Sequence, residues 1–175
     1  KSCFPSSTTV ELEDGSIVRI SELSVGDKVK VGPNTFSKVF MFTHRLSDVY
    51  ANFIEIKTLS GATIALSEGH YIHVDGSVVP AAQVKIGSEV RLGSGHTDKV
   101  RSVRTVGGKG LYNPQTLQGD IVVNNILAST YTTAMDPRLA HAALLPFRTM
   151  FSALNLGVSA LESGGGVASV LLDYI

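Results

Sequence analysis

Short runs of alternating apolar and polar residues, separated by glycine-containing turns, fill the chain from residue 8 to residue 130. A period of two places successive side chains on opposite faces of an extended backbone, so each run predicts one half-buried β-strand. The runs are rich in β-branched residues, which favour strands. The expected strands are Ser16–Ile20, Lys28–Val31, Lys38–Phe42, Phe53–Thr58, Thr63–Leu66, Tyr71–Val74, Glu89–Leu92, Val100–Val103 and Ile121–Val123.

Turn signals and an internal repeat organise these strands. Asp14–Gly15 and Asp75–Gly76 are typical of tight hairpins, because glycine tolerates the positive φ that such turns need. Residues 21–32 match residues 82–93 in order, with glycine, valine and charged positions coinciding. Two repeats of about sixty residues predict an all-β fold built from two related, pseudo-two-fold halves.

The pattern changes after the last predicted strand. Asp136–Pro137 is typical of a helix start, and Pro146 is expected to kink or divide the helix that follows. The apolar residues at helical spacing are Leu139, Ala140, Ala143, Leu144, Phe147, Met150, Phe151 and Leu154. We therefore expect a β-domain over residues 1–132 and a helical tail over residues 133–175.

Composition and charge narrow the classes of function. The 175 residues are 43% hydrophobic and 17% charged, which suits one folded domain with a small appendage. The 15 basic and 15 acidic residues are dispersed, which argues against a nucleic-acid partner that needs phosphate neutralisation. The sequence contains no stretch of about eighteen apolar residues, the length needed to span a membrane, and we expect no signal peptide at its start. A chain that begins without methionine is expected to be a fragment or a processed product.

Cys3 is the only cysteine, and it lies almost at the start of the chain. It cannot form an internal disulfide, so it is a buried small side chain, a link to another chain, or a nucleophile. A cysteine protease acting on other chains would place it in a cleft. A terminal cysteine held by a folded domain can instead attack the carbonyl of the residue just before it.

Among the five histidines, His70 follows a predicted strand in the run Ser67-Glu68-Gly69-His70. A hydroxyl and an imidazole three residues apart can converge on one point, although an exposed strand-end turn is an alternative interpretation. The histidines lack a regular ligand spacing and one cysteine cannot build a thiolate site, so we expect no metal. The chain has no Gly-x-Ser-x-Gly motif, which argues against a serine hydrolase.

The ordered set of motifs resembles a known family. Cys3–Pro5, Val10–Gly15 and Ile20–Val29 resemble the opening of a Hint domain, the fold shared by inteins and Hedgehog C-terminal autoprocessing domains. Ser67–His70 falls where that family has its Thr-x-x-His motif. The Hedgehog branch is favoured by Val122–Tyr131 and by the stretch from Leu139 to His141.

The resemblance implies a cysteine-dependent, single-turnover self-cleavage. The Cys3 thiol attacks the carbonyl of Ser2 to form a thioester, His70 acts as general acid for the departing amine, and Ser67 hydrogen-bonds the scissile bond. A sterol hydroxyl, that of cholesterol in Hedgehog proteins, then releases the upstream protein as a sterol ester. The implied partners are the upstream domain of its own precursor and the sterol co-substrate, with no other cofactor, in the secretory pathway at the endoplasmic reticulum.

Four positions depart from the Hedgehog pattern. Ser67 replaces threonine but keeps the hydroxyl, and Ser2 replaces the glycine that usually precedes the nucleophile. His44 stands where an aspartate usually assists the sterol alcohol, and we expect it to serve as general base, a surface histidine being the alternative. Thr130 stands where a second cysteine is frequent, so a Cys–Cys bond within the domain is excluded.

Alternatives remain for the role of the tail and for the nucleophile that accepts the acyl group from the thioester. The tail either contacts a sterol or a membrane surface, or packs on the β-domain as most apolar stripes do. The residues expected to make sterol or membrane contact are Leu139, His141, Leu144, Phe147, Met150 and Phe151. The alternatives to sterol transfer are the same thioester resolved by water or another nucleophile, and a non-enzymatic lipid-binding β-module with an inert Cys3.

Overall fold

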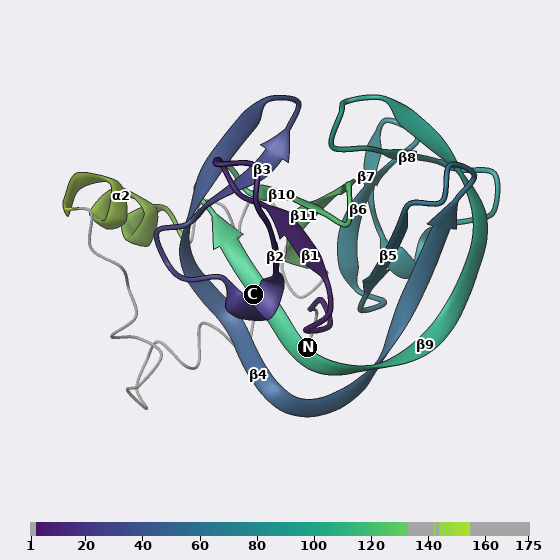
Figure 1. The fold of residues 1–175 in the computed structure, drawn as a ribbon, viewed down its shortest axis with the longest axis horizontal. Helices are drawn as coiled ribbons and strands as arrows, with labels where there is room; N and C mark the ends of the chain where they lie inside the picture. Colours follow the sequence, from purple (N-terminus) through teal and green to yellow (C-terminus); the bar gives the residue numbers. More distant parts are fainter. Residues whose placement is uncertain (1–2, 133–141, 143, 155–175) are drawn as a thin grey trace.

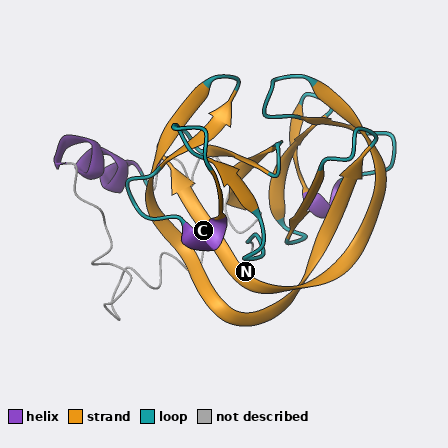
Figure 2. Ribbon diagram, viewed as in Figure 1, coloured by secondary structure: helices purple, strands orange, loops and turns teal. Residues whose placement is uncertain are grey.

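A computed structural model describes residues 3–132, 142 and 144–154, and most of these lie in β-strands (Figure 2). The first half contains β1 (Thr9–Glu11), β2 (Ile17–Arg19), the 3-10 helix η1 (Ile20–Glu22), β3 (Lys28–Gly32), β4 (Thr35–Thr58) and β5 (Thr63–Leu66). The second half contains β6 (His70–Val74), β7 (Ser77–Pro80), the 3-10 helix η2 (Ala81–Gln83), β8 (Glu89–Arg91), β9 (Thr97–Thr116) and β10 (Asp120–Val123). β11 (Ile126–Thr132) and the helix α2 (Leu145–Leu154) follow. The expectation of an all-β fold with a short helical appendage is confirmed.

The two halves repeat the same order of elements. Strand, strand, 3-10 helix and three further strands occur first from β1 to β5 and again from β6 to β10. The matched residues 21–32 and 82–93 take the same place in each half, where a 3-10 helix leads into β3 or β8. The predicted duplication is therefore confirmed.

All strand pairs are antiparallel, and the described strands form one continuous sheet in the order β2-β1-β10-β11-β6-β8-β9-β4-β3, with β5 on β4 and β7 on β6. β4 and β9 run side by side along much of their length and curve together around one side of the molecule (Figure 1). Because β4 belongs to the first half and β9 to the second, this pair joins the two halves of the domain.

The lengths of β4 and β9 correct the sequence prediction of short strands. Residues 38–42 and 53–58 belong to one strand of 24 residues, and residues 100–103 belong to a strand of 20 residues. The stretch 45–50 is exposed, so it lacks the alternation that marks a half-buried strand. Main-chain pairing with β9, interrupted by register shifts, keeps it extended.

Tight turns hold the hairpins in register. Asp75 and Gly76 have φ of 51° and 75° in the β6–β7 turn, and Asn124 and Asn125 have φ of 47° and 66° in the β10–β11 turn. Two successive positive φ values match the twist of a two-residue hairpin. The Asn124 side chain also accepts hydrogen bonds from Thr9 and donates to the Thr63 carbonyl, which joins the turn to β1 and β5.

The main hydrophobic core contains residues from both halves of the domain, and it includes the start of the chain. Phe4 is fully buried in it, which holds the N-terminal segment inside the domain. Burying a phenylalanine side chain stabilises a fold by about 1.5–3 kcal/mol. The largest fully buried side chains of this core are Phe4, Ile20, Leu23, Ile56, Ile64, Leu66, Ile72, Ile121 and Ile126.

A second cluster joins α2 to the β-domain. Leu144 and Phe151 are buried against Phe40, Met41 and Tyr131. Pro146 lies in the first turn of α2, where its missing N–H costs nothing. The expected kink or division of the tail helix at Pro146 involves residues outside the described ones, so it stays a prediction. The predicted helix start at 136–137 lies outside the described residues, and the boundary between residues 132 and 133 stays a prediction.

Candidate active site

The N-terminal segment is held between two strand regions. Phe4 exchanges two backbone hydrogen bonds with Tyr112 of β9, at 2.8 and 2.9 Å. On its other side, the Cys3 amide nitrogen donates to Ser67 Oγ at 2.7 Å, and the Ser67 amide donates to the Cys3 carbonyl at 3.0 Å. Cys3 itself is fully buried, and it belongs to a small cluster with Phe53 and Leu111.

Ser67 therefore contacts the nitrogen of the peptide bond that the sequence analysis singled out. That nitrogen links Cys3 to Ser2, which lies outside the described residues. Ser67 is 7% exposed and sits at the end of β5, where its carbonyl also accepts from the His70 amide at 3.0 Å. The Ser67 hydroxyl contacts the Cys3 amide and the His70 ring packs on Phe4, so both side chains of the Ser-x-x-His run contact the N-terminal segment.

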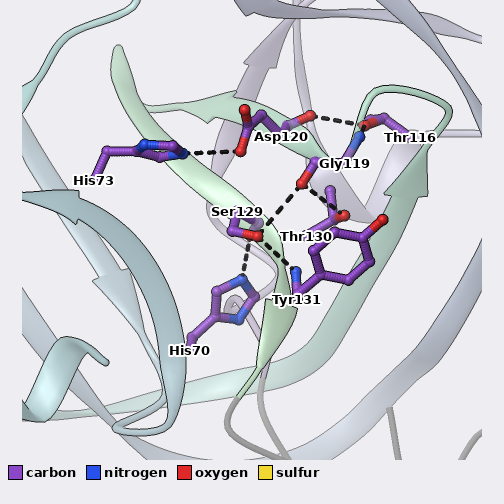
Figure 3. Close-up of polar contacts among 8 residues, drawn as sticks. All are labelled: His70, His73, Thr116, Gly119, Asp120, Ser129, Thr130 and Tyr131. Carbon is purple, nitrogen blue, oxygen red and sulfur yellow. Dashed lines mark hydrogen bonds and ion pairs between the residues drawn. The ribbon is translucent and has the colours of Figure 1, made fainter. Parts of the chain in front are cut away.

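His70 is fully buried at the start of β6. Its ring lies with its centroid 4.2 Å from that of Phe4, and Nε2 lies 2.8 Å from the Ser129 carbonyl of β11 (Figure 3). Because a carbonyl only accepts, Nε2 carries the hydrogen and donates it. Nδ1 then carries the lone pair of the neutral ring, and it has no hydrogen-bond partner among the described residues.

Burial sets the charge of His70. Desolvation of the ring lowers its pKa from 6.5 to about 4, although the hydrogen bond to the Ser129 carbonyl opposes the shift. A general acid, the role expected of His70, needs a proton to donate near neutral pH. In the folded domain the ring is neutral at that pH, so it must first accept a proton before it can act as an acid.

His44 and Thr130 lie on strands beside this segment. His44, half-buried on β4, is the register partner of Asn113 on β9. Asn113 directly follows Tyr112, the partner of Phe4, so the N-terminal segment, β9 and β4 lie in that order. Thr130 is fully buried on β11 and donates to the Gly119 carbonyl at 3.0 Å, as does Ser129 Oγ at 3.4 Å (Figure 3).

Two features of the site escaped the sequence analysis. The carbonyl that orients His70 belongs to the backbone of Ser129. Every residue carries such a carbonyl, so the sequence does not reveal which one contacts His70. A polar cluster made by Thr43, Asn113, Gln115 and Thr130 was also missed. The only available signal was the pair of amides two residues apart, which places both on one face of β9.

The tail residues expected to contact a sterol divide into three groups. Leu144 and Phe151 are buried against the β-domain, and Phe147 is partly buried there. Met150 is 41% exposed. Leu139 and His141 lie outside the described residues.

The described residues contain no group of three or more His, Cys, Asp or Glu side chains arranged to hold a metal ion. No described helix is long and apolar enough to cross a membrane.

Known proteins resemble this chain in sequence and in fold. The family described as "Hint module" matches residues 1–167. Protein hedgehog of Drosophila pseudoobscura pseudoobscura is 31% identical over 163 residues, which cover 85% of this chain and 34% of that protein. Warthog protein 6 of Caenorhabditis elegans is 35% identical over 144 residues, which cover 74% of this chain and 24% of that protein. The chain thus spans about a third or less of these two relatives.

The fold has a solved counterpart at low sequence identity. The crystal structure of the gp41-1 intein superposes with a TM-score of 0.65 at 18% identity, covering 74% of this chain and 98% of the intein. The duplicated antiparallel fold, the buried Cys3 with its Ser-x-x-His partner and these matches lead to one conclusion. The chain belongs to the Hint family, as a domain related to hedgehog proteins and to inteins.

Proposed function

We propose that this domain cleaves the peptide bond between Ser2 and Cys3 in a single-turnover reaction of its own side chains. One observation carries the proposal: the amide nitrogen of that bond is held 2.7 Å from Ser67 Oγ, and the buried His70 ring packs on Phe4, the residue that follows Cys3. Membership of the Hint family supports a self-processing reaction. Burial of the Cys3 thiol supports it too, because exclusion of bulk water protects a thioester from premature hydrolysis.

The first step exchanges an amide for a thioester. The thiol proton of Cys3 passes to His70 Nδ1, and the sulfur forms a bond to the Ser2 carbonyl carbon. The bond from that carbon to the Cys3 nitrogen then breaks, and His70 returns the proton to the nitrogen, which leaves as an amine. His70 suits both transfers because its neutral ring keeps a lone pair on Nδ1 while Nε2 donates to the Ser129 carbonyl.

Ser67 positions the scissile bond in this scheme. By accepting from the Cys3 N–H, its hydroxyl restrains the plane of the scissile peptide bond. A hydrogen bond to the nitrogen also favours the build-up of lone-pair character there as the C–N bond weakens. Ser67 therefore acts on the bond that breaks, while Cys3 and His70 carry the bond-making and proton transfer.

The second step transfers the acyl group to a hydroxyl compound, and the resemblance to the Hedgehog branch favours a sterol such as cholesterol. The hydroxyl oxygen attacks the thioester carbon, a C–O bond forms and the C–S bond breaks. His44 takes the hydroxyl proton, and the Cys3 sulfur regains one. The upstream domain of the precursor would leave as a sterol ester in the secretory pathway, with no cofactor other than the sterol co-substrate.

Water is a second candidate acceptor, and one observation favours it. Leu144 and Phe151, two residues of the expected sterol-contact set, are buried against the β-domain and present no apolar face to a sterol. In this version the same thioester is hydrolysed, and the upstream product is a free acid.

A fusion with a reporter protein before Lys1 tests the proposal. We expect release with dithiothreitol, which captures the thioester, and release with cholesterol. Cys3→Ala should abolish both, whereas His44→Ala should spare the thiol-driven release and lose the cholesterol-driven one. His96→Ala, which changes an exposed histidine in the β8–β9 turn, is the matched control.

Three results would count against it. No release of the reporter by either nucleophile would overturn the thioester and would favour a non-enzymatic lipid-binding module. Equal loss of both releases in His44→Ala would overturn the role of His44. Release of a free acid without any sterol would replace sterol transfer by hydrolysis.

A further inference from the structure

Two buried amides and two threonines form a hydrogen-bonded group on β4, β9 and β11. We call Thr43, Asn113, Gln115 and Thr130 the amide cluster. Asn113 Nδ2 donates to Thr43 Oγ1 at 2.9 Å, and Gln115 Nε2 donates to the Thr130 carbonyl at 2.8 Å. Asn113, Gln115 and Thr130 are fully buried, and Thr43 is 7% exposed.

The amide cluster presents two acceptors without donors. Asn113 Oδ1 and Gln115 Oε1 are buried, and neither accepts a hydrogen bond from any described residue. Turning the Gln115 amide over would set its oxygen against the Thr130 carbonyl, two acceptors face to face, so its orientation is fixed. Buried polar atoms in native proteins are almost always paired, so such acceptors mark a place for an external donor.

The strand register places Asn113 beside the proposed nucleophile. Phe4 pairs with Tyr112 in an antiparallel bridge, so the residue before Phe4 and the residue after Tyr112 lie next to each other. Cys3 shares a buried cluster with Leu111, which lies on the same face of β9 as Asn113. His44 is the register partner of Asn113 on the opposite side, so Asn113 stands between Cys3 and His44.

We propose that Asn113, supported by Gln115, binds the hydroxyl group that resolves the Cys3 thioester. This inference rests on the proposed thioester mechanism. An amide oxygen accepts an O–H hydrogen bond but does not take the proton near neutral pH, so Asn113 orients the nucleophile and His44 removes its proton. The oxygen then attacks the carbonyl carbon, the C–O bond forms, the C–S bond breaks, and Cys3 is restored as a thiol.

The chemistry of the site selects the class of nucleophile. Two acceptor oxygens match an O–H donor, whether it belongs to water or to an alcohol such as a sterol. A thiol is a weak donor and gains little from them. Attack by dithiothreitol should therefore not depend on Asn113, and this separates the amide cluster from the machinery of the first step.

The test compares two nucleophiles on the reporter fusion. In Asn113→Leu, which removes the acceptor at similar size, we expect hydroxyl-driven release to fall about tenfold, the effect of one hydrogen bond. Dithiothreitol-driven release should stay within about twofold of wild type. Asn113→Asp keeps an acceptor oxygen at the same place, and Thr43 can redirect its hydroxyl hydrogen from the main-chain carbonyl of residue 113 to the second carboxylate oxygen. This variant should restore hydroxyl-driven release to within about threefold.

A control variant, a second test variant and the mass of the released fragment complete the experiment. Thr58→Val removes a fully buried hydroxyl at the β4–β5 turn and should leave both releases unchanged. Gln115→Met is the second variant if Asn113→Leu does not fold, and it should follow the same pattern. The mass of the released fragment, a free acid or a cholesterol ester, tells whether water or the alcohol occupies the site.

Three results would overturn the inference. Equal loss of the two releases in Asn113→Leu would show a structural role, and unchanged hydroxyl-driven release would show no role. An Asn113→Asp variant as slow as Asn113→Leu would exclude the acceptor function. If the wild-type fusion releases nothing with either nucleophile, the thioester mechanism itself fails. This result concerns wild type, so it is distinct from a loss of release that is seen only in the Asn113 variants.

Discussion

Replacing His70 by glutamine should make the folded domain less sensitive to mild acid. The buried ring has a pKa of about 4, whereas an unfolded chain would have one near 6.5. Between these values the unfolded state binds a proton that the folded state does not. The free energy of unfolding therefore falls as the pH drops from about 6.5 towards 4, and it is fully retained above 6.5.

The magnitude follows from the two pKa values. Each pKa unit between the folded and unfolded states corresponds to about 1.4 kcal/mol, so the whole difference amounts to about 3 kcal/mol. At pH 5 the loss relative to pH 7.5 should be about 2 kcal/mol from this one group. Glutamine does not titrate, and its amide can still donate to the Ser129 carbonyl.

Urea unfolding at pH 7.5 and pH 5 measures this difference. Both proteins should carry Cys3→Ala, so that no acyl chemistry intervenes. Carboxylates that titrate in the same pH range change the free energy of unfolding equally in both proteins, so their contributions cancel in the comparison. We expect the pH-dependent loss to be smaller in His70→Gln by about 2 kcal/mol. His73→Gln, on the same strand but half-exposed, is the control. Identical losses in His70→Gln and its parent would refute the argument that burial keeps His70 neutral.

Two further predictions concern the scissile bond and the tail. Ser67→Ala should slow dithiothreitol-driven release about tenfold, because one hydrogen bond to the Cys3 amide is lost, and Ser67→Thr should retain the wild-type rate. Loss of release in Ser67→Thr as large as in Ser67→Ala would show that the hydroxyl is not the relevant group. Phe151→Ala should lower the free energy of unfolding by about 3 kcal/mol, whereas the exposed Met150→Ala should cost less than about 1 kcal/mol, as urea unfolding would show. Equal effects would mean that α2 does not rest on the β-domain.

Local patterns in the sequence predicted the parts of the fold that depend on local physics. The turn at Asp75–Gly76 was predictable because positive φ favours glycine, and the halves were predictable because a duplicated sequence folds twice in the same way. The contact between the Cys3 amide and Ser67 joins residues 64 positions apart, so no local pattern contains it. Only the resemblance to the Hint family placed these two residues together.

Other features depend on the three-dimensional surroundings of a residue. The exposed middle of β4 lacks alternation because neither face is buried, so its length could not be predicted from hydrophobic pattern alone. The low pKa of His70 comes from burial beneath Phe4, and its partner is a backbone carbonyl. Asn113 and Gln115 look like solvent-facing positions of an ordinary strand, yet they are fully buried.

The mass of the fragment released from a reporter fusion by dithiothreitol shows which bond is cleaved and through which intermediate. We predict a fragment that ends at Ser2 and carries one dithiothreitol as a thioester, formed by wild type and absent from Cys3→Ala. A fragment cut at any other bond, or the same fragment from Cys3→Ala at the wild-type rate, would contradict it.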